Sequence, residues 1–170
     1  MDLKIKGRNA LVTGGCNGIG KSISIALAKE GVNLTVTTRK KINAKTALKE
    51  FKKFKVKIQV IELDFLKKNW LQKFKSATKN SHYDILVNNA GHALGITDPY
   101  CKVDDWKKII NLNFLSHVEI CNNIIPKMKK KNWGRIVHIS SATSYNLTGG
   151  GPYSSAKMAL NTYVKSLANE

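Results

Sequence analysis

The chain has 170 residues, of which 42% are hydrophobic and 24% are charged. These values are typical of one folded globular domain, and they exclude disordered, collagen-like and disulfide-rich classes. Lysine and arginine number 29 against 11 acidic residues, so the formal net charge is +18. Only three of these cations are arginines, the residue best suited to phosphates and guanines, and the lysines are spread along the chain. We therefore expect a solvated basic surface and no nucleic-acid partner.

The cysteine and histidine positions argue against a disulfide framework and a metal site. Cys16, Cys101 and Cys121 lie far apart, with no C-x-x-C pair and no histidines at a shared metal-ligand spacing. No apolar signal segment opens the chain, and no run reaches the roughly 18 apolar residues that span a membrane. These features predict a cytoplasmic protein with no membrane partner.

The first half of the chain alternates short apolar segments with longer segments of helical periodicity. The apolar segments predict strands, and the periodic segments predict helices. In chain order the sequence predicts a strand at 9–13, a helix at 19–30, a strand at 33–37, a helix at 43–54, a strand at 57–63 and a helix at 66–78.

The second half continues the alternation, which is typical of a parallel sheet covered on both faces. The sequence predicts a strand at 84–87, a long helical stretch at about 104–131 that two helices could share, and a strand at 135–140. The loop ending at Gly149–Pro152 leads into a helix from about Tyr153. The fold class is thus α/β, a Rossmann-like doubly wound sheet in three layers. With no linker or repeat, residues 1–170 form one predicted domain. Its helical pattern still runs at Glu170, which predicts a fragment cut in the helix after the fifth strand.

A glycine-rich segment, TGGCNGIG at 13–20, joins the first strand to the first helix. Glycines allow positive φ and let backbone N–H groups approach a pyrophosphate, which the helix N-terminus also attracts. The spacing G-x-x-x-G-x-G differs from the common G-x-G-x-x-G, so the motif depends on its place between strand and helix. It predicts a dinucleotide site, and a simple connecting turn is the alternative.

The end of the second predicted strand indicates which dinucleotide binds. NAD-binding domains place an acid there, which hydrogen-bonds to the ribose 2′-hydroxyl. This chain has Thr38 at that place, followed by Arg39 and Lys40. A guanidinium can pair with a 2′-phosphate, so the sequence favours NADP(H) over NAD(H). The alternative is that Arg39 is one more surface cation.

Five motifs in the expected order make the chain resemble the short-chain dehydrogenase/reductase family, from Lys6 to the last residue. Within this family, the overall sequence pattern is similar to that of the 3-oxoacyl-acyl-carrier-protein reductases. The motifs are TGGCNGIG at 13–20, Asp64 after the third strand, NNAG at 88–91, WKKIINLN at 106–113, and HISS at 138–141 followed by YSSAK at 153–157.

The resemblance implies that catalysis uses Asn113, Ser141, Tyr153 and Lys157. Aligning on Gly134 and Arg135 favours Ser141, and Ser140 is its competitor. Asn113 is expected to anchor a water that relays protons to the lysine, or else to be a capped or exposed polar residue.

The resemblance also implies the residues that bind the cofactor, one of which has a second interpretation. Asp64 can contact adenine, cap the following helix, or do both. The full predicted set is Gly14, Cys16, Asn17, Gly18, Ile19, Gly20, Arg39, Asp64, Asn89, Ala90, Gly91, Tyr153 and Lys157. Cys16 is expected to act as a small loop residue, not a nucleophile, and His138 as a packed strand residue.

Tyr153 and Lys157 are four residues apart, so on a helix they share one face. A free phenol titrates near about pH 10, and a neighbouring ammonium favours the phenolate. Tyr153 can then act as general acid and base, while Ser141 hydrogen-bonds to the substrate oxygen and Lys157 holds the ribose hydroxyls.

These residues predict an NADPH-dependent oxidoreductase that acts on a small carbonyl or alcohol substrate, which an acyl-carrier protein could present. The hypothesis from a different class is a nucleotide-binding fragment without turnover. The resemblance implies that strands and a substrate lid follow the catalytic helix, and that a full-length chain forms a homo-oligomer, a tetramer built partly on the helices at 104–131 and 153–170.

Overall fold

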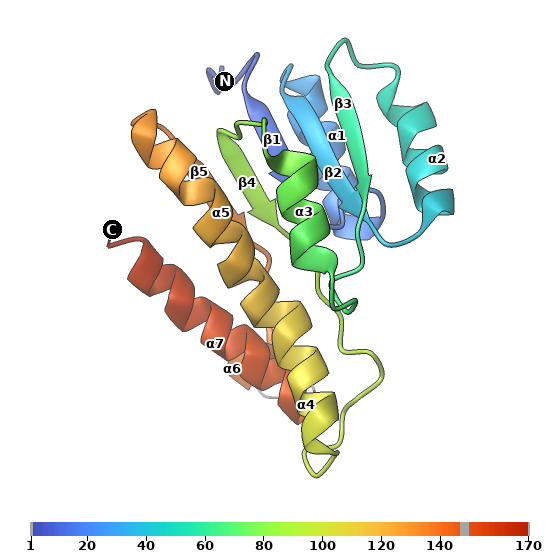
Figure 1. The fold of residues 1–170 in the computed structure, drawn as a ribbon, viewed down its shortest axis with the longest axis vertical. Coiled ribbons are helices and arrows are strands. Elements are labelled where there is room, and N and C mark those ends of the chain that lie inside the picture. The colour runs from blue at the N-terminus through green and yellow to red at the C-terminus, as the bar shows by residue number, and fades with distance from the viewer. Residues whose placement is uncertain (1, 147–149, 170) are drawn as a thin grey trace.

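A parallel sheet of five strands organises the protein, which a computed structural model describes at residues 2–146 and 150–169 (Figure 1). The strands run in the order β3-β2-β1-β4-β5, and every neighbouring pair is parallel. Their bounds are β1 (Asn9–Val12), β2 (Asn33–Thr38), β3 (Ile58–Glu62), β4 (Ile85–Asn88) and β5 (Arg135–His138). The predicted α/β doubly wound fold class is confirmed.

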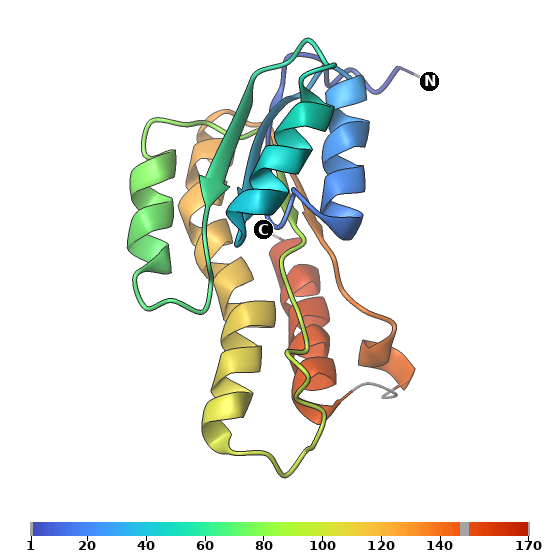
Figure 2. The same cartoon turned by 90° about the vertical axis from the view of Figure 1, so that its right-hand side faces the viewer.

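Helices cover both faces of this sheet, as the two perpendicular views show (Figures 1 and 2). One apolar cluster packs α1 and α2 against the strands, and a second cluster packs α3, α5 and α7 against the other face. The helices are α1 (Gly18–Lys29), α2 (Lys41–Phe51), α3 (Trp70–Thr78), α4 (Val103–Ile110), the π-helical turn η1 (Asn111–Leu115), α5 (Ser116–Lys130), α6 (Thr143–Asn146) and α7 (Gly151–Leu167).

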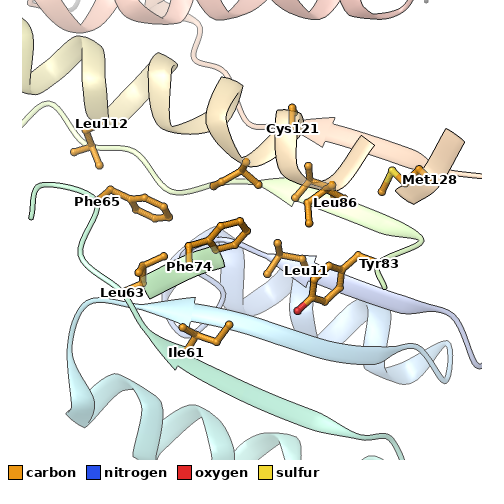
Figure 3. Close-up of a cluster of buried hydrophobic side chains, with 12 residues drawn as sticks. Leu11, Ile61, Leu63, Phe65, Phe74, Tyr83, Leu86, Leu112, Cys121 and Met128 are labelled. Atoms are coloured by element: carbon orange, nitrogen blue, oxygen red, sulfur yellow. The ribbon is translucent and has the colours of Figure 1, made fainter. Parts of the chain in front are cut away.

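The second cluster shows how the alternating strand pattern builds a core (Figure 3). Leu11 of β1 and Leu86 of β4 point to the same face, where Phe74 of α3 and Met128 of α5 meet them. All four are at most 4% exposed. Each buried side chain of this size contributes roughly 1.5–3 kcal/mol, so this face fixes the sheet against its helices.

The predicted order of strands and long helices is confirmed with bounds mostly within three residues, and three features differ from the prediction. The helix expected at 66–78 begins only at Trp70, because the residues before it form turns. In the first of these turns the Lys67 N–H donates a hydrogen bond to the Asp64 carbonyl. The stretch expected at about 104–131 is one continuous helical run with a π turn inside it. The short helix α6 was not predicted. Gly149 and Glu170, used in two predictions above, lie outside the described residues.

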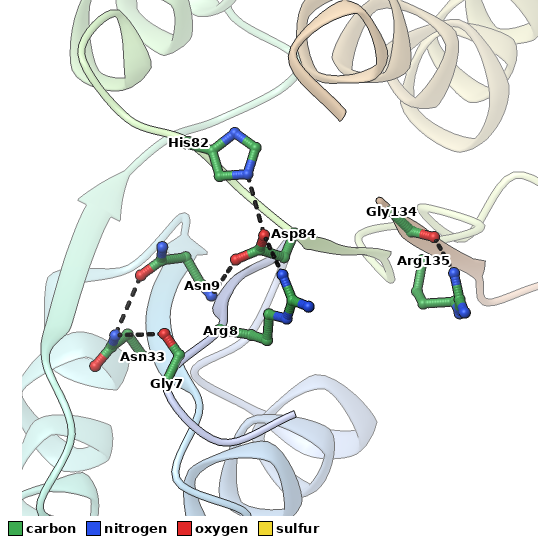
Figure 4. Close-up of polar contacts among 8 residues, drawn as sticks. All are labelled: Gly7, Arg8, Asn9, Asn33, His82, Asp84, Gly134 and Arg135. Atoms are coloured by element: carbon green, nitrogen blue, oxygen red, sulfur yellow. Dashed lines mark hydrogen bonds and ion pairs between the residues drawn. The ribbon is translucent and has the colours of Figure 1, made fainter. Parts of the chain in front are cut away.

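Polar and charged side chains interact with one another at the amino ends of β1 and β4 (Figure 4). The Asp84 carboxylate accepts hydrogen bonds from the Asn9 backbone N–H at 2.9 Å and from the Arg8 guanidinium at 3.3 Å. His82 Nε2 lies 3.1 Å from the same carboxylate. Burial acts to raise the pKa of Asp84, but these three partners together lower it below its usual range. We call Asp84, Arg8, His82 and Asn9 the amino-end cluster.

Candidate active site

A cavity of about 640 Å³ lies at the opposite, carboxyl edge of the sheet. Parallel α/β sheets bind ligands at this edge, where the strand order reverses, here between β1 and β4. Each strand contributes lining residues at or just after its end, including Gly14, Thr38, Asp64, Asn89 and Ile139. The volume is in the range of cofactor and small-molecule sites.

The glycine-rich loop after β1 packs its backbone against the turn after β4. Gly14 has a φ of 64°, a left-handed conformation that glycine adopts without strain. A Cβ atom at Gly20 would clash with the Gly14 carbonyl oxygen, so the start of α1 can approach the loop only without one. Asn89 Nδ2 donates to the Thr13 carbonyl at 2.9 Å, and Gly14 N donates to Thr37 Oγ1 at 3.1 Å. The loop is thus fastened to both neighbouring strands.

The predicted loop residues divide into two groups. Gly14, Asn17 and Ile19 line the cavity, whereas Cys16, Gly18 and Gly20 are not among its lining residues. Burial raises the pKa of the Cys16 thiol to about 11, although a hydrogen bond with Thr38 acts in the other direction. Cys16 is therefore a protonated, buried loop residue at neutral pH.

Cations occupy the cavity wall at the end of β2. Arg39 and Lys40 both line the cavity and are solvent-exposed. Thr38, where an acid would bind a ribose 2′-hydroxyl, is buried, and its hydroxyl contacts the Lys40 backbone at 3.4 Å. Asn43, in the first turn of α2, also lines this wall and was not predicted. Its position in the first turn of the helix that follows Arg39 and Lys40 is the signal that could have found it.

Asp64 lines the cavity beside this wall. Its Oδ1 accepts a hydrogen bond from the Leu66 N–H at 3.1 Å, which stabilises the turn after β3. The expectation that Asp64 could cap the following helix is wrong, because α3 starts at Trp70 with Asn69 at the N-cap position. The residues at 65–68 form a turn first, so Asp64 is too far from the helix end.

The NNAG turn after β4 is held from both sides. Thr13 Oγ1 accepts hydrogen bonds from the backbone N–H groups of Asn89 and Ala90, each at 2.9 Å. A Cβ atom at Gly91 would lie 2.6 Å from Asn113 Oδ1 and 3.2 Å from Lys157 Nζ. Glycine at position 91 therefore allows the turn after β4 to pack closely against Asn113 of η1 and Lys157 of α7.

Asn113 is fully buried in the π turn η1 and contacts the loop that follows Gly91. Its Oδ1 accepts from the His92 N–H at 2.9 Å, and its Nδ2 donates to the carbonyls of His92 and Ile109, both at 3.0 Å. The wider π turn changes the register of the helix at this residue. Asn113 thus fixes the backbone of His92 and does not itself line the cavity. His92 lines the cavity and was not predicted.

Lys157 and Tyr153 both project from α7 into the cavity wall. Lys157 is 2% exposed, and its Nζ donates to the Ile139 carbonyl at 2.8 Å and lies 5.8 Å from the centroid of the Tyr153 ring. Burial lowers the pKa of Lys157 to about 8. Among the described residues, none offers it a carboxylate within ion-pair distance.

The two serines after β5 both line the cavity but differ in their contacts. Ser141 Oγ accepts hydrogen bonds from the backbone N–H of Thr143 at 3.3 Å and from the Thr143 hydroxyl at 3.0 Å. Ser140 Oγ is buried without a partner. Thr143 opens the unpredicted helix α6, so that helix fixes the orientation of the Ser141 side chain.

Two histidines with no predicted role in the site lie behind the cavity wall. His117 is fully buried on α5, and its Nε2 lies 2.8 Å from the Ala90 carbonyl oxygen. Its Nδ1 lies 3.4 Å from Nδ1 of His138 on β5. Burial, with the nearby Lys157 cation, lowers the pKa of His117 to about 3 and that of His138 to about 4. His117 follows Asn113 by one helical turn, which is the signal that could have found it.

Neither a membrane-spanning helix nor a metal-ligand cluster is present in the part of the chain that the structure describes. No helix there is both long enough and apolar enough to cross a membrane. No three acidic, cysteine or histidine side chains come together as metal ligands.

Comparison with known proteins agrees with this geometry. The 3-oxoacyl-acyl-carrier-protein reductase FabG of Aquifex aeolicus is 33% identical over 174 aligned residues, which cover all of this chain and 70% of the relative. The 3-dehydrosphinganine reductase of Danio rerio is also 33% identical, over 99% of this chain and 53% of that protein.

Solved structures share the fold at lower identity. The L-sorbose reductase of Gluconobacter frateurii, complexed with NADPH and L-sorbose, superposes with a TM-score of 0.91 at 28% identity. A 7α-hydroxysteroid dehydrogenase complexed with NADH superposes with a TM-score of 0.88 at 27% identity. The chain spans 66% of the length of each of these two structures. Residues 8–170 match the family described as short chain dehydrogenase, and the chain therefore belongs to that family of oxidoreductases.

Proposed function

We propose that this chain carries the cofactor and catalytic site of an NADPH-dependent carbonyl reductase. The observation that supports this most is one cavity whose walls include the cations Arg39 and Lys40 at one strand end and Ser141, Tyr153 and Lys157 at another. Relatives that align with 99% or more of this chain are named reductases, and one solved relative is complexed with NADPH.

The residues present fit a dinucleotide. The glycine-rich loop leaves the cavity wall at Gly14 free of side-chain atoms, and a Cβ atom there would lie 3.0 Å from Asn89 Nδ2. Asp64 offers a carboxylate for adenine. The N-terminus of α1 follows the loop directly, and Asn17 at its N-cap makes no side-chain capping hydrogen bond, so a pyrophosphate is favoured there. Arg39 and Lys40 would hold the 2′-phosphate, since no acid ends β2 to repel it.

The proposed catalytic residues would have different roles in the reduction of the carbonyl group. Bound NADPH would supply the hydride. Tyr153 would donate a proton to the carbonyl oxygen, and Ser141, already oriented by Thr143, would hydrogen-bond to that oxygen and hold it. Lys157, buried and without a carboxylate partner, would favour the phenolate of Tyr153 and hold the ribose hydroxyls. Asn113 would keep the segment at 92 in place beside them.

The substrate class we propose is a 3-oxoacyl thioester, which an acyl-carrier protein could present. Support comes from two FabG relatives at 33% and 34% identity over 99% or more of this chain. The basic surface, with its charge of +18, suits an acidic carrier. A homo-oligomer built on α4, α5 and α7 is part of the same proposal, and it is supported by the exposed Leu115 in η1, between α4 and α5, and the exposed Met158 on α7.

The experiment mixes the chain with NADPH and an acetoacetyl thioester and follows the loss of NADPH absorbance. We expect oxidation of NADPH that depends on the thioester, and a slower rate with NADH. A simple ketone in place of the thioester tests the substrate class alone. NADPH binding without any turnover would favour the other hypothesis, a dinucleotide-binding segment that does not catalyse.

A further inference from the structure

The hydrogen bonds around His117 fix the position of each of its protons. A carbonyl oxygen can only accept, so the 2.8 Å contact with the Ala90 oxygen requires a proton on His117 Nε2. The ring is fully buried close to the Lys157 cation, which disfavours a second proton. His117 Nδ1 is therefore a bare acceptor.

The same reasoning fixes the tautomer of His138. Its Nδ1 lies 3.4 Å from the bare Nδ1 of His117, so a hydrogen bond between them needs the proton on His138. Its Nε2 then accepts, and the thiol of Cys121, 3.8 Å away, is the donor that faces it. Tyr163 and Asn88 complete this environment through contacts with the Cys121 sulfur. The donors point in one direction, from Cys121 through the two rings to the Ala90 carbonyl.

The far end of this chain of hydrogen bonds is the peptide between Ala90 and Gly91. In a trans peptide the C=O and N–H groups point in opposite directions, and the described residues contain no cis peptide. Because His117 holds the Ala90 oxygen on the buried side, the Gly91 N–H faces away from His117, where Gly91 lines the cavity. Thr13 holds the other face of the turn through the Asn89 and Ala90 N–H groups.

We propose that His117 and His138 are positioning residues, a neutral and one-directional histidine pair that fixes the Ala90–Gly91 peptide so that the Gly91 N–H faces the dinucleotide. The pair touches neither substrate nor cofactor and acts through this peptide. Only the part that concerns the dinucleotide rests on the proposed function, because the tautomers and the peptide orientation belong to the unliganded chain.

Nitrogen-15 NMR of the wild-type imidazoles tests the pair directly. Near neutral pH we expect the Nε2–H tautomer for His117 and the Nδ1–H tautomer for His138, which is the less common form in solution. His82, in the amino-end cluster, serves as the reference histidine in the same spectrum. A cationic ring at either position, or an Nε2–H tautomer at His138, would overturn the proposal.

Two substitutions of His117 separate positioning from simple packing. His117→Gln keeps an amide N–H that can reach the Ala90 oxygen, and His117→Leu has a similar size but no donor. We expect His117→Leu to shift the carbonyl carbon resonance of Ala90 and to weaken NADPH binding about 3- to 10-fold, as for one lost hydrogen bond, while His117→Gln stays within about 2-fold of wild type.

The control is His82→Leu, which removes a histidine far from the cavity and should leave NADPH affinity unchanged. Equal NADPH affinity in wild type and His117→Leu, or equal losses in the Leu and Gln variants, would contradict a positioning role. If no variant and no wild-type chain binds NADPH, the proposed function fails, whereas the tautomers and the Ala90 resonance still decide the histidine pair.

Discussion

The two ends of the sheet contain similar polar residues arranged for different purposes. At the amino end, the Asp84 carboxylate is surrounded by Arg8, His82 and the Asn9 N–H, and its pKa is lowered (Figure 4). At the carboxyl end, the buried Lys157 ammonium has a carbonyl partner, and its pKa is lowered to about 8. In both places the pKa is lowered, but for a carboxyl this stabilises the charge and for an amine it destabilises it.

The amino end of the sheet therefore contributes to stability, whereas the carboxyl end has the features of a functional site. The amino-end cluster lowers the free energy of the folded state by pairing its charge. The carboxyl end keeps a charge that the fold does not neutralise, which is the arrangement expected of a group that acts on a ligand. Substitutions at the two ends should therefore affect different measurements.

The largest effect should follow Tyr153→Phe, which removes the proposed proton donor and leaves the ring. We expect the turnover number to fall by at least about 100-fold, the usual contribution of a general acid, with NADPH affinity and thermal stability nearly unchanged. Tyr145→Phe is the matched control, because Tyr145 lies on α6 and is 80% exposed. Equal turnover in the two variants would remove Tyr153 from the mechanism.

Asp84→Ala should produce the opposite result at the amino end. It leaves the Asn9 N–H and Arg8 without their acceptor, and we expect the free energy of unfolding to fall by about 2 kcal/mol. NADPH affinity of the folded protein should not change. Because the folded-state pKa of Asp84 is lowered, its contribution is present above about pH 4 and is lost as the pH falls through the folded value.

Urea unfolding at neutral pH and at low pH measures this effect. The wild-type and Asp84→Ala curves should converge at low pH, where Asp84 is protonated in both states. A loss that is the same at both pH values would mean that the charge of Asp84 does not contribute.

Arg39→Ala should alter the choice of cofactor at the carboxyl end. If Arg39 pairs with the 2′-phosphate, NADPH binding should weaken by roughly 1–3 kcal/mol, while NADH binding stays as in wild type. Lys41→Ala, an exposed cation two residues further on, provides the control for net charge. Equal losses for NADPH and NADH would contradict a role at the 2′-phosphate.

The histidine pair should make the stability of the folded chain depend on pH. Both histidines have a folded-state pKa below the unfolded value of about 6.5, so the unfolded chain binds more protons between pH 6 and 4. Stability should therefore fall as the pH falls through this window, by about 1.4 kcal/mol per pH unit for each histidine. Lys157, Cys121 and Tyr163 are the other titratable groups near the two rings.

Unfolding curves of wild type and His117→Gln at pH 6 and pH 5 measure this slope. In His117→Gln, the part of this pH slope that the two histidines cause should be about half of its wild-type value. An unchanged slope would show that His117 is protonated equally in the folded and unfolded states.

Local patterns in the sequence predicted most of the fold. The strands are short apolar runs and the helices have clear periodicity, so their order and approximate bounds follow from the chain itself. The start of α3 was missed because the helical periodicity also covers residues 66–69, which form a turn. The backbone N–H groups of Leu66 and Lys67 in this turn donate hydrogen bonds to Asp64. Helix α6 is only four residues long, which is too short for any periodic signal.

The candidate site was predicted where its residues share a motif, and missed where they meet only in three dimensions. Gly14, Asp64, Tyr153 and Lys157 belong to recognisable segments, and all four line one cavity. His117 and His138 are on different elements, and only the packing of α5 against β5 brings their Nδ1 atoms to 3.4 Å from each other. Sequence spacing contains no information about such a contact, so a histidine on a strand was interpreted as packing alone.

Thermal unfolding of the chain with NADPH, with NADH and without ligand tests directly whether the carboxyl edge of the sheet binds a dinucleotide. A ligand at 100 times its dissociation constant adds about 2.7 kcal/mol to the folded state. We expect a cooperative transition whose midpoint rises with either dinucleotide and rises further with NADPH at equal concentration. A cooperative transition that neither dinucleotide moves would contradict a dinucleotide site at the carboxyl edge of this sheet.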